Sequence, residues 1–167
     1  LVAGSYLYRP GGIVHGFVDN SPSGSDIIIK MGTSTDLISV NKPLHSYEYP
    51  EPKALVPDGR EHILHLRTNE EKWIPLSNDE ICMSYKVLSH DKDNGAQTLL
   101  MSVPQNYSGA TMFKDNFNWE IVVIDGDIEI GDTGVFKKYS YTFRPSGSGS
   151  FRIDSSINGA TLMAWRD

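Results

Sequence analysis

The sequence predicts an all-β fold, and three observations support this prediction. Fifteen glycines and nine prolines divide the 167 residues into short segments. The segments between them are rich in β-branched and aromatic side chains, which is typical of strands. No stretch shows the spacing of apolar side chains that a long amphipathic helix requires. We therefore expect many short strands and few helices.

Nine segments are predicted as strands because each is bounded by Gly, Pro, Asn or Asp. In chain order they are Ser5–Tyr8, Asp26–Met31, Cys82–Ser89, Gln97–Val103, Ile121–Ile124, Asp127–Ile130, Tyr139–Phe143, Phe151–Ile153 and Thr161–Trp165. Asp125-Gly126 separates two of them, and this dipeptide is typical of a tight hairpin turn. A hairpin is therefore expected at this point.

Between Thr33 and Leu55 the pattern of strands is lost. Prolines at 43, 50, 52 and 57 prevent a helix or a central strand from running far. The segment is predicted to be a linker or an extension. Tyr47–Pro52 is expected to be extended, either packed across the protein, which we favour, or reaching a partner chain.

Composition excludes several classes of protein. The net charge of −6 argues against a nucleic-acid partner, because affinity for phosphate comes from clustered Lys and Arg. No apolar run approaches the roughly 18 residues of a membrane span. Cys82 is the only cysteine, so an internal disulfide is impossible and a cytoplasmic, reducing location is expected. Cys82 itself is interpreted as a buried apolar residue rather than a nucleophile.

The sequence contains an internal repeat at a constant offset of 135 residues. Ser5 to Asp19 aligns without gaps with Ser140 to Asp154, and Ser, Tyr, Arg, Pro, Gly and Asp coincide. The register continues through Gly24 and Gly159 into two apolar runs. Such a spacing predicts two copies of one supersecondary unit rather than a solenoid, whose period is about 20 to 50 residues.

The two copies differ in what precedes them. A full set of predicted strands lies ahead of the second copy, from about Trp73, whereas no strands precede the first. A sheet without those strands would leave edge N–H and C=O groups unpaired. We therefore expect strands from a longer polypeptide, or from a separate chain or fragment, to complete the first unit.

The first copy also carries a recognisable motif. Gly4, Pro10, Gly12 and His15 fall on the spacing of the second cupin motif, with Asp19 where Asn is usual. The stretch from Trp73 to Gly131 is similar to the second domain of bicupins of the ChrR-like group. The resemblance implies a cupin fold, which is a double-stranded β-helix or jelly-roll barrel, duplicated as a bicupin with the first barrel incomplete. Residues 1–32 would close the first barrel, 33–63 would form a Pro-rich linker, and 64–167 would form the second barrel.

The resemblance also implies a metal site. In cupins the His of motif two joins two His and a Glu of motif one to hold a divalent iron, manganese, nickel or zinc ion. His15 would then be a metal ligand, provided that upstream ligands are present, because one His does not make a site. Alternatively, His15 is a barrel-mouth histidine that hydrogen-bonds a carbonyl. Tyr6, Tyr8 and Arg9 are candidates for the substrate-pocket wall, and Tyr6 and Tyr8 should share a face of their strand.

The same family spacing can be applied to the second barrel, counting back from Gly126. The Glu of motif one then falls on Trp119, its two His on Phe113 and Asp115 or on Met112 and Lys114, and the His of motif two on Ser150. All four ligands are replaced, so the second barrel is predicted to be metal-free. Phe113, Trp119 and Phe151 either plug its interior, which we expect, or line an apolar pocket for a small ligand.

Two functions remain open at this stage. The first is a metal-dependent bicupin enzyme of dioxygenase, lyase or isomerase type that acts on a small organic molecule. The second is a noncatalytic cupin that binds a small ligand or a partner subunit, with a vestigial metal site. A homodimer is expected by resemblance, because cupins often pair through sheet edges. His62 and His65 lie in a segment that reads as a strand, which would place them on opposite faces and argues against a metal pair.

Overall fold

A computed structural model of the chain describes residues 2–10, 22–31, 59–77, 82–113, 116–149 and 151–167. The chain divides into two compact units. One comprises Leu1 with Gly11–Pro57, and the other comprises Val2–Pro10 with Asp58–Asp167. All strands of the described residues belong to the second unit. Most of the predicted linker, including residues 33–58, lies outside the described residues.

The described residues form an almost purely β structure, as predicted. The strands are β1 (Ser5–Tyr8), β2 (Ile63–Arg67), β3 (Ile74–Pro75), β4 (Ser84–His90), β5 (Gln97–Val103), β6 (Tyr107–Phe113), β7 (Trp119–Ile130), β8 (Gly134–Lys137), β9 (Tyr141–Arg144), β10 (Phe151–Ser156) and β11 (Ala160–Arg166). A single 3-10 turn, Gly131–Thr133, is the one helical element in the part of the chain that is described. No helix there is long and apolar enough to cross a membrane.

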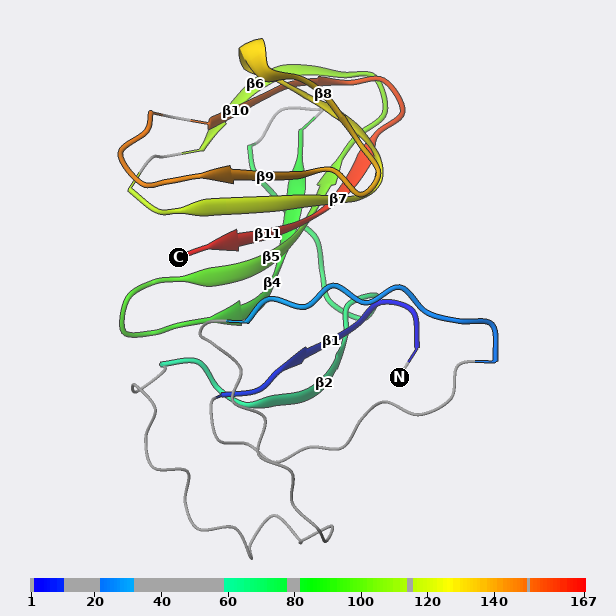
Figure 1. Cartoon of the computed structure of the whole chain (residues 1–167), viewed down its shortest axis with the longest axis vertical. Helices are drawn as coiled ribbons and strands as arrows, with labels where there is room; N and C mark the ends of the chain where they lie inside the picture. The colour runs from blue at the N-terminus through cyan, green and yellow to red at the C-terminus, as the bar shows by residue number, and fades with distance from the viewer. Residues whose placement is uncertain (1, 11–21, 32–58, 78–81, 114–115, 150) are drawn as a thin grey trace, which may run out of the picture. The chain divides into compact units, whose positions relative to one another are not determined.

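Nine strands form one curled antiparallel sheet, and β7 is its centre. The order is β3-β4-β5-β11-β7-β10-β6, with β8 and β9 also paired to β7. The first half of β7 pairs with β11 and β9, and the second half pairs with β8 and β10. Figure 1 shows β9, β7, β11, β5 and β4 side by side. One strand thus serves two layers, which lets the sheet curl into a jelly-roll barrel.

A β-bulge in the middle of β7 replaces the predicted hairpin. Thr161 of β11 lies opposite Asp125, but Leu162 lies opposite Val123, so one extra residue is inserted in β7. Gly126 follows with φ of +80°. The prediction of a turn at Asp125-Gly126 is therefore wrong, because the positive φ of the glycine is used for a bulge inside a continuous strand.

The bulge keeps both halves of β7 facing the core. Before it, the buried side chains are at odd positions, and after it they are at even positions, because the extra residue shifts the alternation by one. The core between the layers is made of sixteen buried side chains: Met83, Leu99, Met101, Val103, Tyr107, Phe113, Trp119, Ile121, Val123, Ile128, Ile130, Phe151, Ile153, Ala160, Leu162 and Ala164.

The remaining strands, β1 and β2, pair antiparallel with each other. Gly4, just before β1, has φ of +80°, and its carbonyl accepts hydrogen bonds from both the backbone N–H and the hydroxyl of Thr68, at 2.9 and 2.8 Å. The segment around His62 and His65 that reads as a strand in the sequence is confirmed as one by β2, which contains His65. β1 coincides with its predicted range.

The predicted strand Asp26–Met31 is not a strand in the structure. Its counterpart in the repeat, β11, pairs with β5 on one side and with β7 on the other. The glycines that precede the two segments nevertheless share one conformation, because Gly24 and Gly159 both have φ of +78°. Ile27, Ile28, Ile29 and Met31 are exposed, at 61%, 44%, 69% and 60%. Among the described strands none pairs with this segment, and a strand exists only where neighbouring strands supply hydrogen bonds.

Candidate ligand pocket in the barrel

Three side chains line up across the inner face of the sheet at one end of the barrel. Arg166, the last residue of β11, lies opposite Gln97 at the start of β5 and opposite Trp119 at the start of β7. Residues directly opposite each other in antiparallel strands point to the same face. This row therefore forms the floor of a site where β5 and β7 begin and β11 ends.

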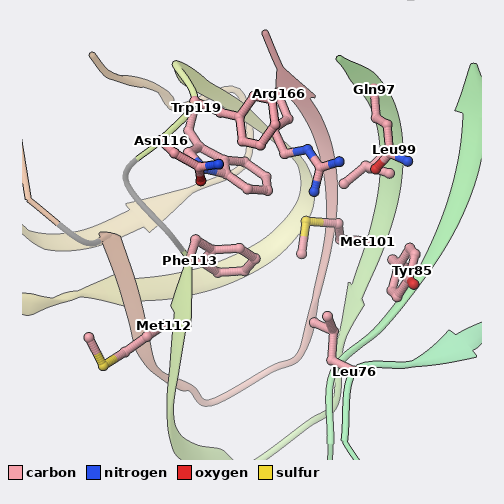
Figure 2. A pocket seen from close by; sticks show the side chains of 11 residues that line it. Leu76, Tyr85, Gln97, Leu99, Met101, Met112, Phe113, Asn116, Trp119 and Arg166 are labelled. Carbon is pink, nitrogen blue, oxygen red and sulfur yellow. The ribbon is translucent and has the colours of Figure 1, made fainter. Parts of the chain in front are cut away.

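A pocket of about 380 Å³ occupies this end of the barrel. This volume lies within the range of small-molecule sites, about 300 to 1,000 Å³. Figure 2 shows the Arg166 guanidinium projecting into it between the side chains of Trp119 and Leu99. The lining residues are Leu76, Tyr85, Gln97, Leu99, Met101, Met112, Phe113, Asn116, Phe117, Trp119 and Arg166.

Aromatic side chains form one wall of the pocket. Phe113 lies edge-on to Trp119 and stacks on Phe151, with ring centroids 4.9 Å apart in each pair. All three side chains are buried. Edge-to-face and stacked pairs at this distance stabilise the packing beyond the burial of their area. The aromatic cluster thus fills part of the interior, while Phe113 and Trp119 also face the pocket, so each of the two sequence-based alternatives describes part of the arrangement.

Arg166 carries the positive charge of the pocket. Its Nη2 donates a hydrogen bond to the Gly95 carbonyl at 3.1 Å, and its guanidinium carbon lies 4.5 Å from the centroid of the Phe117 ring. Its Nε is buried and has no hydrogen-bond partner among the described residues. Burial lowers the pKa of Arg166 below its usual range, and the nearby Tyr85 opposes this shift. The site therefore contains a partly desolvated cation with an unused donor.

The predicted metal ligand His15 lies outside the described residues. The predicted pocket-wall residues are described, and two of them make contacts within the second unit. Tyr6 donates a hydrogen bond to the Ser89 hydroxyl at 2.9 Å, and the Tyr8 ring lies beneath the Arg60 guanidinium, 5.5 Å away. Arg9 follows β1 and is half-buried. Their assignment to a substrate-pocket wall stays a prediction.

The structure brings together two of the four positions at which the family pattern places metal ligands in the second barrel. Phe113 and Trp119 are in contact there, whereas Asp115 and Ser150 lie outside the described residues. A phenyl ring has no ligand atom, and the indole N–H only donates. Within the described ranges, no group of three His, Cys, Asp or Glu could hold a metal ion. The side chains at Phe113 and Trp119 thus do not fit a metal. His65, whose pairing with His62 as a metal site was argued against above, has its Nε2 atom 2.9 Å from the Ser5 hydroxyl.

Sequence reasoning did not single out Arg166, although a signal was present. In β11, Leu162 and Ala164 are fully buried, and Arg166 continues the same alternation. A charged residue at the inner-face position of a terminal strand indicates either a buried ion pair or a ligand contact. The alternation of β11 was therefore sufficient to place Arg166 inside the barrel.

No protein-family model matches the chain, and no curated protein matches it. Among solved structures, a dioxygenase candidate from Nostoc punctiforme aligns with a TM-score of 0.53 at 20% sequence identity. An RmlC-like cupin from Ralstonia eutropha aligns with a TM-score of 0.50 at 13% identity, and FeII HppE with a TM-score of 0.50 at 15% identity.

These alignments cover 64%, 59% and 59% of this chain, respectively. They span 36%, 64% and 57% of the neighbours' own lengths, so the chain matches less than two thirds of each. At such identities the likeness establishes the fold alone. The fold is that of a cupin, as the motif of the first repeat copy and the predicted jelly-roll barrel indicated.

Proposed function

We propose that this cupin binds a small organic molecule in the pocket at the end of the barrel formed by β3 to β11. The observation that carries the proposal is the row of Gln97, Arg166 and Trp119 beneath a pocket of about 380 Å³. Small-molecule sites combine apolar walls with polar groups that converge on the same space. Polar and apolar atoms contribute similar shares of the lining here.

A variant that fills the pocket tests this proposal. Gln97→Trp places a large ring on the floor of the pocket, and Trp is a residue that strands accommodate well. Gln105→Trp is the control, because it adds the same ring in an exposed loop away from the pocket. A panel of small aromatic molecules, followed by ligand-observed NMR, should give binders for the wild type and for Gln105→Trp, but not for Gln97→Trp. Equal binding to Gln97→Trp, or no binder for the wild type, would contradict the proposal.

A second candidate function is metal-dependent catalysis in another barrel of the same protein, of dioxygenase, lyase or isomerase type. The observation that favours it is the motif-two spacing that ends in His15. The names of two structural neighbours, a dioxygenase candidate and FeII HppE, are consistent with it but come from proteins at 20% and 15% identity. The metal would be iron, manganese, nickel or zinc, held by His15 together with ligands from another segment.

Metal analysis separates the two functions. We expect about one equivalent of divalent metal per pair of barrels, lost in His15→Ala and retained in His90→Ala, because His90 is an exposed residue of β4. A thermal-shift series with divalent metals should raise the melting temperature of the wild type only, since a ligand of the folded state stabilises it. If the protein contains no metal and responds to none, metal-dependent catalysis is contradicted and small-molecule binding is the one candidate function that remains.

The two-barrel organisation, of the ChrR-like type, is part of this proposal. Its support is the repeat, now joined by the identical φ of Gly24 and Gly159. The proposed division assigns residues 1–32 to the first barrel, 33–63 to a linker and 64–167 to the second barrel. The proposed partner is the segment that completes the first barrel, present as a separate chain or fragment. Homodimerisation through a sheet edge belongs to the same proposal. Intact mass with size-exclusion chromatography tests both: a single 18.6 kDa monomer without a companion fragment would contradict them.

A further inference from the structure

We propose that the ligand of the barrel pocket is a small organic acid, whose carboxylate is bound by Arg166 and whose aromatic or aliphatic body lies against Phe113 and Trp119. This inference rests on the proposed small-molecule function and names its ligand class.

The charge balance of the pocket carries the first step. Arg166 is its cationic lining residue, and none of the described lining residues is Asp or Glu. The Nε atom is buried without a hydrogen-bond partner there. A buried cation is stabilised when an anion is placed beside it, because burial without a counter-charge disfavours the ionised form. An anionic ligand in the pocket would supply the missing charge.

The geometry of the guanidinium carries the second step. Nη2 is engaged with the Gly95 carbonyl, and Phe117 lies against the guanidinium. These two contacts fix the orientation of the guanidinium, whose Nη1 makes no hydrogen bond with the described residues, and the end of the group that carries Nη1 is left for a ligand. A carboxylate matches the planar end of a guanidinium, because its oxygens accept charge-assisted hydrogen bonds from the terminal nitrogens. The orientation of Arg166 therefore favours a carboxylate, which needs only this one cation.

The walls define the rest of the ligand. Leu99, Met101, Phe113 and Trp119 present carbon and sulfur atoms to the pocket, and Gln97 and Tyr85 add neutral polar groups. Burial of an apolar body against such walls contributes roughly 25 cal/mol per Å² of apolar surface. A fully polar acid would forgo this contribution, so an aryl- or alkyl-substituted carboxylate fits better.

A matched pair of probes tests the inference. 3-Phenylpropanoate and 3-phenylpropanamide have the same size and shape, but only the acid carries a charge at pH 7. We expect the wild type to bind the acid at least about tenfold more tightly than the amide, as expected of a charge-assisted hydrogen bond. The preference should disappear in Arg166→Gln and persist in Arg152→Gln, because Arg152 is an exposed residue of β10 paired with Asp154.

The Arg166 Nε–H resonance gives a second readout that does not depend on Arg166→Gln being folded. It is assigned by its absence from the spectrum of Arg166→Lys, and it should move on addition of the acid but not of the amide. Equal affinity for acid and amide would overturn the carboxylate inference while leaving the small-molecule function intact. A preference for acid that survives Arg166→Gln would overturn it as well. Binding of neither probe would also overturn it, and the pocket function is then judged separately by the aromatic panel and Gln97→Trp.

Discussion

Asp127 shows at the level of one residue how the turn between β10 and β11 is held. Its carboxylate accepts a hydrogen bond from the Ile157 N–H at 2.9 Å and another from the Asn158 side chain, and its carbonyl accepts one from Ser156 at 2.6 Å. Burial raises the pKa of the Asp127 carboxyl, but the hydrogen bonds that it accepts outweigh burial, so its pKa is lowered in the folded protein. The ionised carboxylate is thus part of the folded structure.

The lowered pKa of Asp127 predicts a specific pH dependence. In the unfolded chain an Asp titrates near about 3.9, so the stabilisation by Asp127 is fully present above that pH and is lost as the pH falls through the lower pKa of the folded state. Asp127→Asn should lower the free energy of unfolding at pH 7 and weaken its dependence on pH below about 4. Urea unfolding at pH 7, 5, 4 and 3 measures this.

Asp125→Asn is the matched control, because Asp125 is an exposed carboxylate two residues away on the same strand. Asp125→Asn should leave the dependence of the free energy of unfolding on pH below about 4 as it is in the wild type. If the two variants behaved alike, the hydrogen bonds of Asp127 would not explain the acid sensitivity.

At the scale of the element, the bulge of β7 depends on Gly126. A Cβ atom there would overlap the carbonyl oxygen of Gly159, which accepts the Asp127 N–H at 3.1 Å, and the φ of +80° is unfavourable for any L side chain. Gly126→Ala should therefore lower the free energy of unfolding by about 3 kcal/mol or more, the range expected where strain and overlap combine. Urea unfolding again gives the value.

Gly147→Ala separates overlap from strain. Gly147 has φ of +76° in the turn after β9, and an added Cβ there would meet open space. Its cost should be that of the left-handed conformation alone, about 1 to 2 kcal/mol. Similar losses for both variants would mean that contact with Gly159 plays no part.

The strands that sequence reasoning found and those it missed differ in a physical way. β5 and β11 lie inside the sheet, so their buried positions carry apolar side chains in alternating or continuous runs. Such runs are visible in the sequence, and both strands were predicted from it. β6 was missed because Ser108, Gly109 and Ala110 interrupt its β propensity. The Tyr107 ring covers Gly109, so packing rather than propensity sustains this edge strand. The Asp125-Gly126 bulge was mistaken for a hairpin turn because a glycine with positive φ is typical of both kinds of structure.

The candidate site was predictable only in part. Family spacing drew attention to Phe113 and Trp119, and the structure brings both together at the pocket. Arg166 and Gln97 are 69 residues apart in sequence, and only the register between β5 and β11 reveals that they are opposite each other. The pairing of distant strands is a property of the folded sheet, which local patterns do not contain.

At the scale of the whole second unit, two long side chains connect the β1–β2 pair with the barrel. Tyr6 of β1 donates to Ser89 of β4, and Lys86 of β4 donates from Nζ to the Thr68 carbonyl at 2.7 Å. Ser89 and Lys86 are both buried, so their polar groups depend on these partners. These two hydrogen bonds hold the β1–β2 pair to β4.

This connection predicts that a single hydroxyl in β1 affects the stability of the barrel. Tyr6→Phe should lower the free energy of unfolding by about 1 kcal/mol, because the buried Ser89 hydroxyl loses its donor. Tyr8→Phe is the control in the same strand, since it keeps the ring beneath Arg60. Thermal denaturation followed by circular dichroism measures both, and an unchanged melting temperature in Tyr6→Phe would show that β1 does not stabilise the barrel.

The sharing of β7 between two layers also determines how the barrel opens. The two layers cannot separate without breaking the strand that both contain, so we expect partial opening at the strands paired on one side only, β3, β6, β8 and β9. Amide protons of β7 and β11, which have paired neighbours on both sides, should exchange with deuterated solvent only in global unfolding events, with one common free energy of opening. The protein should accordingly resist proteases as one block, with cleavage beginning at the barrel's outer strands.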